Sequence, residues 1–279
     1  MIVVLLALGA STAWGVADFT AGLKSRTLGV LHVLVVGQVS GLLLIGLVVA
    51  ARNTAPGGQA VLWAIPAAFA GTLGLIAFLR SMAVGTISIV APIVGASAVV
   101  PVAYGLARGD RPSWIQGAGV ALTLSGVFAA SREPSPAGGK EHRVVAGVGL
   151  ALLAALGFGC YFPFMHAASD AGVFWAVLVF RSISSTVALV AFALVRPEST
   201  VRRADLPVLV LIGVGDVLGN VLFASAASRG LVSLVSVLSS LYPVITVALA
   251  WLVVRERLAG SQWLGVAAVL LGVAAIAGG

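Results

Sequence analysis

The chain has 279 residues, of which 60% are hydrophobic and only 9% are charged. Soluble domains carry about 25% charged residues, so this chain lacks the polar surface of a water-soluble fold and must be coated by lipid. A net charge of +7 is compatible with nucleic-acid binding, but the basic residues lie mostly in short segments between apolar runs, as in loops that face anionic lipid. The composition therefore predicts an all-α integral membrane protein with no nucleic-acid partner.

Ten apolar runs follow one another along the chain, each with enough residues to span a bilayer. A spanning helix needs about 20 largely apolar residues. The first run has no basic residue before it, so we interpret it as a spanning helix and not as a signal peptide. The predicted spans are residues 2–21, 31–51, 62–84, 87–106, 114–130, 145–168, 172–195, 206–227, 231–254 and 262–277.

The longest polar stretch, residues 131–144, falls near the midpoint of the chain. It predicts a linker between a first unit, residues 1–130, and a second unit, residues 145–279, with five spans in each. Cys160 is the only cysteine, which excludes an intrachain disulfide and a Cys-rich metal site. We expect neither a metal nor a cofactor.

The two units repeat one another in sequence. A shift of 145 residues places Phe78 and Gly85 on Phe223 and Gly230. Further pairs at shifts of 145 to 147 are Gly74 with Gly219, Ser88 with Ser233, Asp110 with Glu256, Gln116 with Gln262, Gly119 with Gly265, Gly126 with Gly272, and Trp14 with Tyr161. Because each unit has an odd number of spans, the second must enter the membrane from the opposite side. This is an inverted 5+5 repeat, the usual construction of secondary transporters.

An ionisable side chain near the bilayer centre costs about 2.5 to 3.5 kcal/mol on insertion scales, so each one is a functional candidate. The candidates are Asp18, Arg80, His166, Arg181 and Asp216. Arg181 and Asp216 fall near the middle of their spans, where we expect an ion pair. Asn220 lies one turn beyond Asp216 on the same face. We predict that this trio faces a polar cavity, and a purely structural pair is the alternative. Gln38 matches Arg181 at a shift of 143. The first unit therefore has a neutral residue where the second unit has a charged one.

Asp18 and Arg80 lie at similar depths, near the far ends of the first and third spans. Three interpretations stay open. The two residues form an ion pair, or Asp18 is a titrating carboxylate that couples transport to protons, or both reach toward the interface near Lys24 and Arg26.

Prolines inside spans free backbone carbonyls, which a membrane tolerates where protein or a wet cavity satisfies them. Pro243 follows Ser239, Ser240 and Tyr242 within four residues. These three residues either line a path or only pack at a kink. Trp14 and Tyr161, at matched positions, are candidate cavity-lining aromatic residues.

Glycines seven residues apart predict packing surfaces on the fifth and tenth spans, with dimerisation as one use of them. These are Gly119 with Gly126 and Gly265 with Gly272. The chain is therefore expected to be a monomer or a homodimer.

Residues in common order along both units carry a family resemblance. They are Trp14-Gly15, the stretch from Ala91-Pro92 to Pro101, Ser240-Leu241-Tyr242-Pro243, and Arg255-Glu256-Arg257 leading to Gln262 and Gly265. Over essentially its whole length the chain resembles the EamA-type branch of the drug/metabolite transporter superfamily. The resemblance implies an inverted five-plus-five bundle that exports small metabolites or toxic compounds. Small four-span relatives use a first-span glutamate for proton coupling, and this chain has no Glu there.

The expected function is secondary active export of small polar or amphipathic metabolites, amino-acid-like or drug-like, by alternating access in the cell membrane. A sugar or nucleoside uptake carrier and a passive channel are the alternatives. An intramembrane enzyme is not expected, because the sequence has no His-Glu-x-x-His or Gly-x-Ser-x-Gly motif. Most Lys and Arg fall on the side opposite the termini, which predicts termini outside, whereas similar transporters keep both termini in the cytoplasm.

Overall fold

The computed structural model describes residues 1–84, 90, 93–130, 141–198, 201–254, 260, 263–265, 267–268, 271–272 and 275. Within these ranges all regular elements are helices. They are α1 (Ile2–Leu28), α2 (Val30–Arg52), α3 (Gly58–Val84), η1 (Ala96–Ala98), α5 (Val99–Ala107), α6 (Trp114–Ala130), α7 (Glu141–Val195), η2 (Arg203–Asp205), α8 (Leu206–Ala227), α9 (Val232–Ser239), α10 (Tyr242–Leu249) and η3 (Ala250–Val254).

Six helices in the described part of the chain are long and apolar enough to cross a membrane. They are Ile2–Leu28, Val30–Arg52, Gly58–Val84, Gly147–Val195, Arg203–Ala227 and Val232–Val253. The all-α membrane fold expected from the composition is thus confirmed. Helix α6 coincides with the predicted fifth span, and the fourth and tenth runs lie partly outside the described residues.

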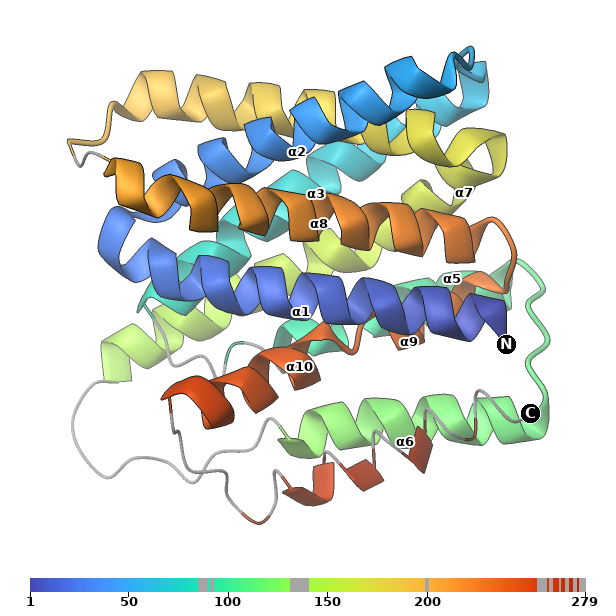
Figure 1. Cartoon of the computed structure of the whole chain (residues 1–279). Helices are drawn as coiled ribbons and strands as arrows, with labels where there is room; N and C mark the ends of the chain where they lie inside the picture. Colours follow the sequence, from blue (N-terminus) through green and yellow to red (C-terminus); the bar gives the residue numbers. More distant parts are fainter. Residues whose placement is uncertain are drawn as a thin grey trace.

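Helix α7 contains two spans joined at one glycine. A straight helix of its 55 residues would be about 80 Å long, far more than the roughly 30 Å hydrocarbon core of a bilayer. Gly172 interrupts the helix with φ 153° and ψ 103°, a backbone conformation that glycine adopts without steric cost. The two arms run in opposite directions from this point (Figure 1) and coincide with the predicted sixth and seventh spans.

Local sequence sets the ends of the other long helices. Gly29, with φ 81°, separates α1 from α2. Asn53 ends α2 in the left-handed conformation that is common after a helix C-terminus. A proline in the first turn of α8 sits where its missing N–H costs nothing. Helices α1, α2 and α8 lie side by side along the bundle, although α8 is far from the other two in sequence (Figure 1).

The bundle is apolar outside and polar at its centre. Leu47 and Leu211 are 71% and 67% exposed, whereas Arg181 is fully buried. In water this distribution would be unfavourable, but lipid tails solvate leucine and the protein interior must satisfy the polar groups. The arrangement positions a charged group where no lipid reaches it.

Glycines allow the closest helix crossings. A Cβ on Gly213 of α8 would collide with the carbonyl of Gly37 and the hydroxyl of Ser40 on α2. A Cβ on Gly272 would lie 2.7 Å from the carbonyl oxygen of Gly119. The predicted packing surfaces of the fifth and tenth spans therefore meet each other within one chain at these two glycines.

The ninth predicted span is broken in the middle. Helix α9 ends at Ser239 and α10 begins at Tyr242, and residues 240–241 form a turn. Asp110, from a distant loop, caps α9 because its Oδ2 accepts hydrogen bonds from the backbone N–H and the hydroxyl of Ser233, at 3.0 and 2.7 Å. Discontinuous helices of this kind line the binding sites of many transporters.

Candidate functional site

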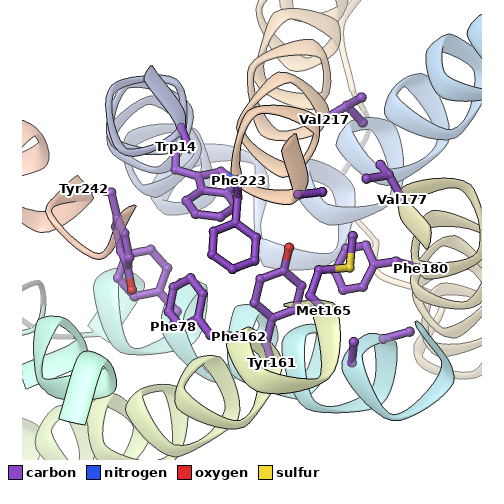
Figure 2. Packing of buried hydrophobic residues seen from close by; sticks show 14 of the residues in the cluster. Trp14, Phe78, Tyr161, Phe162, Met165, Val177, Phe180, Val217, Phe223 and Tyr242 are labelled. Carbon is purple, nitrogen blue, oxygen red and sulfur yellow. The ribbon is translucent and has the colours of Figure 1, made fainter. Parts of the chain in front are cut away.

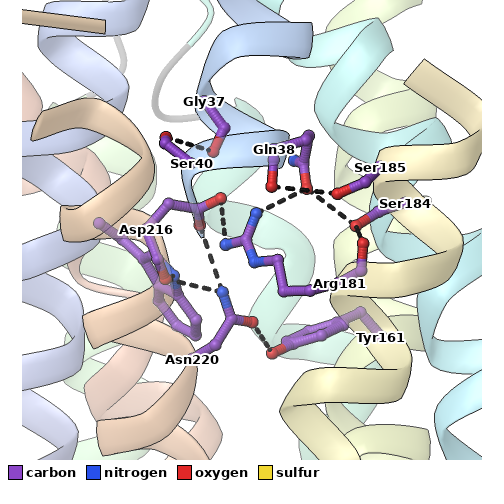
Figure 3. A network of polar contacts seen from close by, with 10 residues as sticks. Gly37, Gln38, Ser40, Tyr161, Arg181, Ser184, Ser185, Asp216 and Asn220 are labelled. Carbon is purple, nitrogen blue, oxygen red and sulfur yellow. Dashed lines mark hydrogen bonds and ion pairs between the residues drawn. The ribbon is translucent and has the colours of Figure 1, made fainter. Parts of the chain in front are cut away.

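The expected ion pair between Arg181 and Asp216 is present at the centre of the bundle (Figure 3). Arg181 projects from the second arm of α7, and its Nη2 lies 2.5 Å from Oδ2 of Asp216 on α8. Because the guanidinium is fully buried, an unpaired charge there would cost several kcal/mol, roughly 3–5 on removal of its partner. The two helices are therefore held together by this pair.

Gln38 of α2 holds the other side of the guanidinium. Nη1 of Arg181 donates a hydrogen bond of 2.6 Å to Oε1 of Gln38, and the Ser184 hydroxyl donates to the same oxygen at 2.8 Å. The Ser185 hydroxyl donates to the backbone oxygen of Gln38 at 3.0 Å. Sequence reasoning identified Gln38 but missed both serines. Their signal was two adjacent polar residues one turn from a mid-membrane arginine.

Asn220 links the ion pair to the first arm of α7. The Tyr161 hydroxyl donates to Oδ1 of Asn220 at 2.5 Å. Nδ2 of Asn220 donates to the backbone oxygen of Asp216 at 2.7 Å and to its Oδ1 at 3.3 Å. Trp14 of α1 also donates to the backbone oxygen of Asp216, at 3.3 Å. The network thus joins α1, α2, α8 and both arms of α7 (Figure 3).

A cavity of about 60 Å³ adjoins this network. It has room for only a few water molecules and is smaller than the roughly 300–1,000 Å³ of a small-molecule site. The cavity must therefore widen to hold such a molecule. The cavity is lined by Trp14, Asp18, Gln38, Gly71, Thr72, Leu75, Phe158, Tyr161, Phe162, Phe180, Asp216, Asn220 and Tyr242.

Aromatic rings form much of the cavity wall (Figure 2). The ring of Trp14 meets those of Tyr161 and Tyr242 edge to face, with centroids 6.3 and 6.4 Å apart. Phe162 and Phe223 complete the cluster, 6.2 and 5.9 Å from Trp14. Trp14, Tyr161 and Tyr242 were candidates from the sequence. The phenylalanines were not, because phenylalanine is common throughout apolar spans.

Asp18 lines the cavity, and Arg80 does not. The suggested ion pair between them is wrong, because Arg80 is exposed on α3 and no ion pair joins the two in the described part of the chain. Equal depth did not imply contact, since the rotation of each helix decides which way a side chain points. Lys24 instead pairs with Asp205 at 2.7 Å, and Arg26 donates to the carbonyl of Met82 at 3.4 Å.

Ser239 is the last residue of α9, and Ser240 lies in the turn between α9 and α10. They are 0% and 2% exposed and are absent from the cavity lining, whereas Tyr242, two residues later, lines it. His166 also lies away from the cavity. The break therefore presents one of the three suggested residues to the site.

The fold and the interior cavity define a multi-pass membrane protein with a polar site among its helices. Residues 145–278 match the model of the EamA-like transporter family, the family that the sequence resembles. This match indicates a membrane transporter of the drug/metabolite superfamily.

The fold is shared by solved structures, of which 27 chains match. One crystal structure has a TM-score of 0.78, covering 98% of this chain and 95% of that chain at 15% sequence identity. At this identity the likeness concerns the fold alone. No curated protein sequence matches the chain.

Proposed function

We propose that the protein is a secondary active transporter that exports small polar or amphipathic metabolites across the cell membrane by alternating access. One observation carries the proposal: a small, aromatic-lined cavity lies beside an ion pair whose guanidinium is fully buried, in a chain whose residues 145–278 match the EamA-like transporter family. An ionic network costs free energy inside a membrane, and a transport site is a common reason for its presence.

An inverted repeat of ten spans, five in each unit, supports the mechanism. Helix α1 and the first arm of α7, which begin the two units, run in opposite directions in Figure 1, as inverted copies do. Two pairs of matched residues also touch. Trp14 packs on Tyr161 with ring centroids 6.3 Å apart, and Arg181 donates to Gln38. Residues exchanged by a two-fold axis meet only beside that axis, so both contacts favour a site at the interface of the repeats.

Matched glycines support the same symmetry. A Cβ on Gly219 of α8 would lie 2.5 Å from the ring of Trp14 on α1. A Cβ on its counterpart Gly74, of α3, would lie 3.0 Å from the ring of Phe158 on the first arm of α7. Each unit therefore contributes one glycine that admits an aromatic side chain from the other unit. Two such half-sites that rock about a shared centre would open it to either side in turn.

The experiment combines a binding screen with counterflow. Purified protein is screened for thermal stabilisation by amino acids, amines, sugars and nucleosides. Each stabilising compound is then loaded unlabelled into proteoliposomes that are diluted into a trace of the labelled compound. A carrier exchanges the two and produces a transient internal excess of label, whereas a channel gives simple equilibration.

We expect Asp216→Asn to abolish the transient excess and the control Asp170→Asn, at an exposed position, to retain it. Both variants should still insert in the membrane. Normal counterflow by Asp216→Asn would contradict the role of the ion pair, and equilibration without excess in the unmodified protein would identify a channel.

A further inference from the structure

The cavity contains one carboxylate that the protein does not neutralise. Asp18 and Asp216 are the charged residues that line it. Asp216 is neutralised by Arg181. Asp18 has neither an ion pair nor a hydrogen bond within the described ranges. With both aspartates ionised, the site therefore carries one net negative charge.

Two hydroxyl groups in the same wall also have unused hydrogen-bonding capacity. Thr72 and Tyr242 both line the cavity and are 1% and 4% exposed. Their hydroxyl oxygens have no hydrogen-bond partner among the described residues. A buried polar group without a partner costs about 1–3 kcal/mol, so a ligand that bonds to it gains affinity. Each hydroxyl can accept a hydrogen bond from a group placed in the cavity or donate one to it.

Apart from these two hydroxyls, the polar donors named so far are engaged within the protein. The Trp14 N–H and the Asn220 amide donate to Asp216. The Tyr161 hydroxyl donates to Asn220, and Arg181 is held by Asp216 and Gln38. An anionic group entering the site would meet the Asp18 carboxylate without gaining a free cation.

The aromatic wall favours the same sign of charge. Ring faces of Trp, Tyr and Phe attract cations by about 0.5–2 kcal/mol when the cation is desolvated. They also present a rigid apolar surface to a hydrophobic body. Trp14, Phe158 and Tyr242 supply such surfaces to the cavity.

We propose that this site takes a small organic monocation, an amine with an apolar or aromatic body, whose ammonium group lies beside Asp18. The inference rests on the proposed transport function and narrows its substrate class. A zwitterion adds its own carboxylate to that of Asp18, and nothing in the site neutralises it. A neutral compound leaves the Asp18 charge unpaired. The cavity of about 60 Å³ must widen to admit such a molecule.

A series of compounds with one body and different charges tests the proposal. The probes are phenethylamine, 2-phenylethanol, phenylalanine and 3-phenylpropionate, which near neutral pH are cationic, neutral, zwitterionic and anionic. Tetramethylammonium is added as a cation without a ring. Thermal stabilisation and tryptophan fluorescence of the purified full chain report binding. We expect phenethylamine to bind at least 10-fold more tightly than the other members of its series.

Matched variants locate the binding. We expect Asp18→Asn to weaken phenethylamine at least 10-fold and Asp170→Asn, the same change at an exposed position outside the cavity, to leave it unchanged. If Asp18→Asn does not fold, Thr72→Val replaces it, with an expected loss of several-fold. The charge series on the unmodified protein is decisive in either case.

Three results would each overturn the proposal. They are equal or tighter binding of phenylalanine or phenylpropionate, no binding of either cation, and undiminished amine binding in the folded Asp18→Asn variant. The proposed function fails separately. An amine that binds at Asp18 without counterflow refutes transport and keeps the site, whereas counterflow of a neutral or anionic compound without amine binding keeps transport and refutes the cation site.

Discussion

The Arg181 guanidinium is the residue on which the site is built. It is fully buried, and its partners come from two other helices, Asp216 of α8 and Gln38 of α2. A charge in that position is stable only while its partners remain, because the cost of desolvation is offset by the pair and not by either residue alone.

A single and a double variant measure how far the stability of the buried guanidinium depends on its partner. We expect Asp216→Asn to destabilise the protein by about 3–5 kcal/mol, because it leaves an unneutralised buried guanidinium. Adding Arg181→Gln should recover much of that loss without restoring counterflow. The measurement is unfolding of purified protein in mixed detergent micelles. Equal stability of Asp216→Asn and the double variant would show that the unpaired guanidinium costs the protein little free energy of unfolding.

The sequence predicts these central residues because an unpaired charge inside a membrane is costly. A charge at mid-membrane depth requires a partner at the same depth, which identifies Arg181 with Asp216. Duplication then identifies Gln38. Arg80 was wrongly included, because depth does not fix helix rotation. Thr72 was missed, because an isolated threonine is ordinary in a membrane helix. The size of the cavity depends on packing among helices that are far apart in the sequence, and local sequence does not encode that packing.

At the scale of elements, glycines set how closely helices approach. Gly219 admits the ring of Trp14 between α1 and α8, whereas Gly46 of α2 faces open space, with nothing within 4 Å of the point where a Cβ would lie. The same substitution therefore has opposite expected effects at the two sites.

We expect Gly219→Ala to cost about 1–3 kcal/mol, because the added carbon overlaps the indole and displaces it. The indole is part of the cavity wall, so ligand-dependent stabilisation should also fall. Gly46→Ala should be neutral or stabilise by up to about 1 kcal/mol, since alanine is the better helix former. Unfolding in micelles and tryptophan emission check both variants. If the Gly219→Ala variant has the same stability and tryptophan emission as the unmodified protein, the close crossing of α1 and α8 at Gly219 is disproved.

The element boundaries themselves were largely predictable. Apolar length, Gly29, Asn53 and Gly172 mark helix ends that the composition of the spans anticipates. The turn at residues 240–241 was not predicted as a break. Pro243 signalled a kink, but a proline does not specify that the helix ends and begins again, as it does between Ser239 and Tyr242.

For the whole molecule, the ion pair between Lys24 and Asp205 fastens one end of the bundle. It joins the C-terminal part of α1 to the residue before α8, at 2.7 Å, and both side chains are partly exposed. Exposed pairs contribute about 0.2–1 kcal/mol, enough to change the populations of two conformations by up to about five-fold. In an alternating-access protein, a loss of this pair favours opening at its own end and disfavours opening at the other.

The most direct test of alternating access needs no knowledge of the cargo. Thr72→Cys places a thiol in the cavity wall, in a background where Cys160→Ala removes the native cysteine. A membrane-impermeant maleimide is applied to vesicles from one side or the other. The rates are compared with and without Lys24→Gln, with Arg203→Gln as a control at an exposed position of the same end.

We expect Lys24→Gln to raise labelling about two- to five-fold from the side of the broken ion pair and to lower it from the opposite side. The reversed pair Lys24→Asp with Asp205→Lys should restore both rates, and Arg203→Gln should change neither. A rise from both sides at once would indicate a pore. No labelling from either side would show that the cavity is only a packing feature, and either result would contradict alternating access.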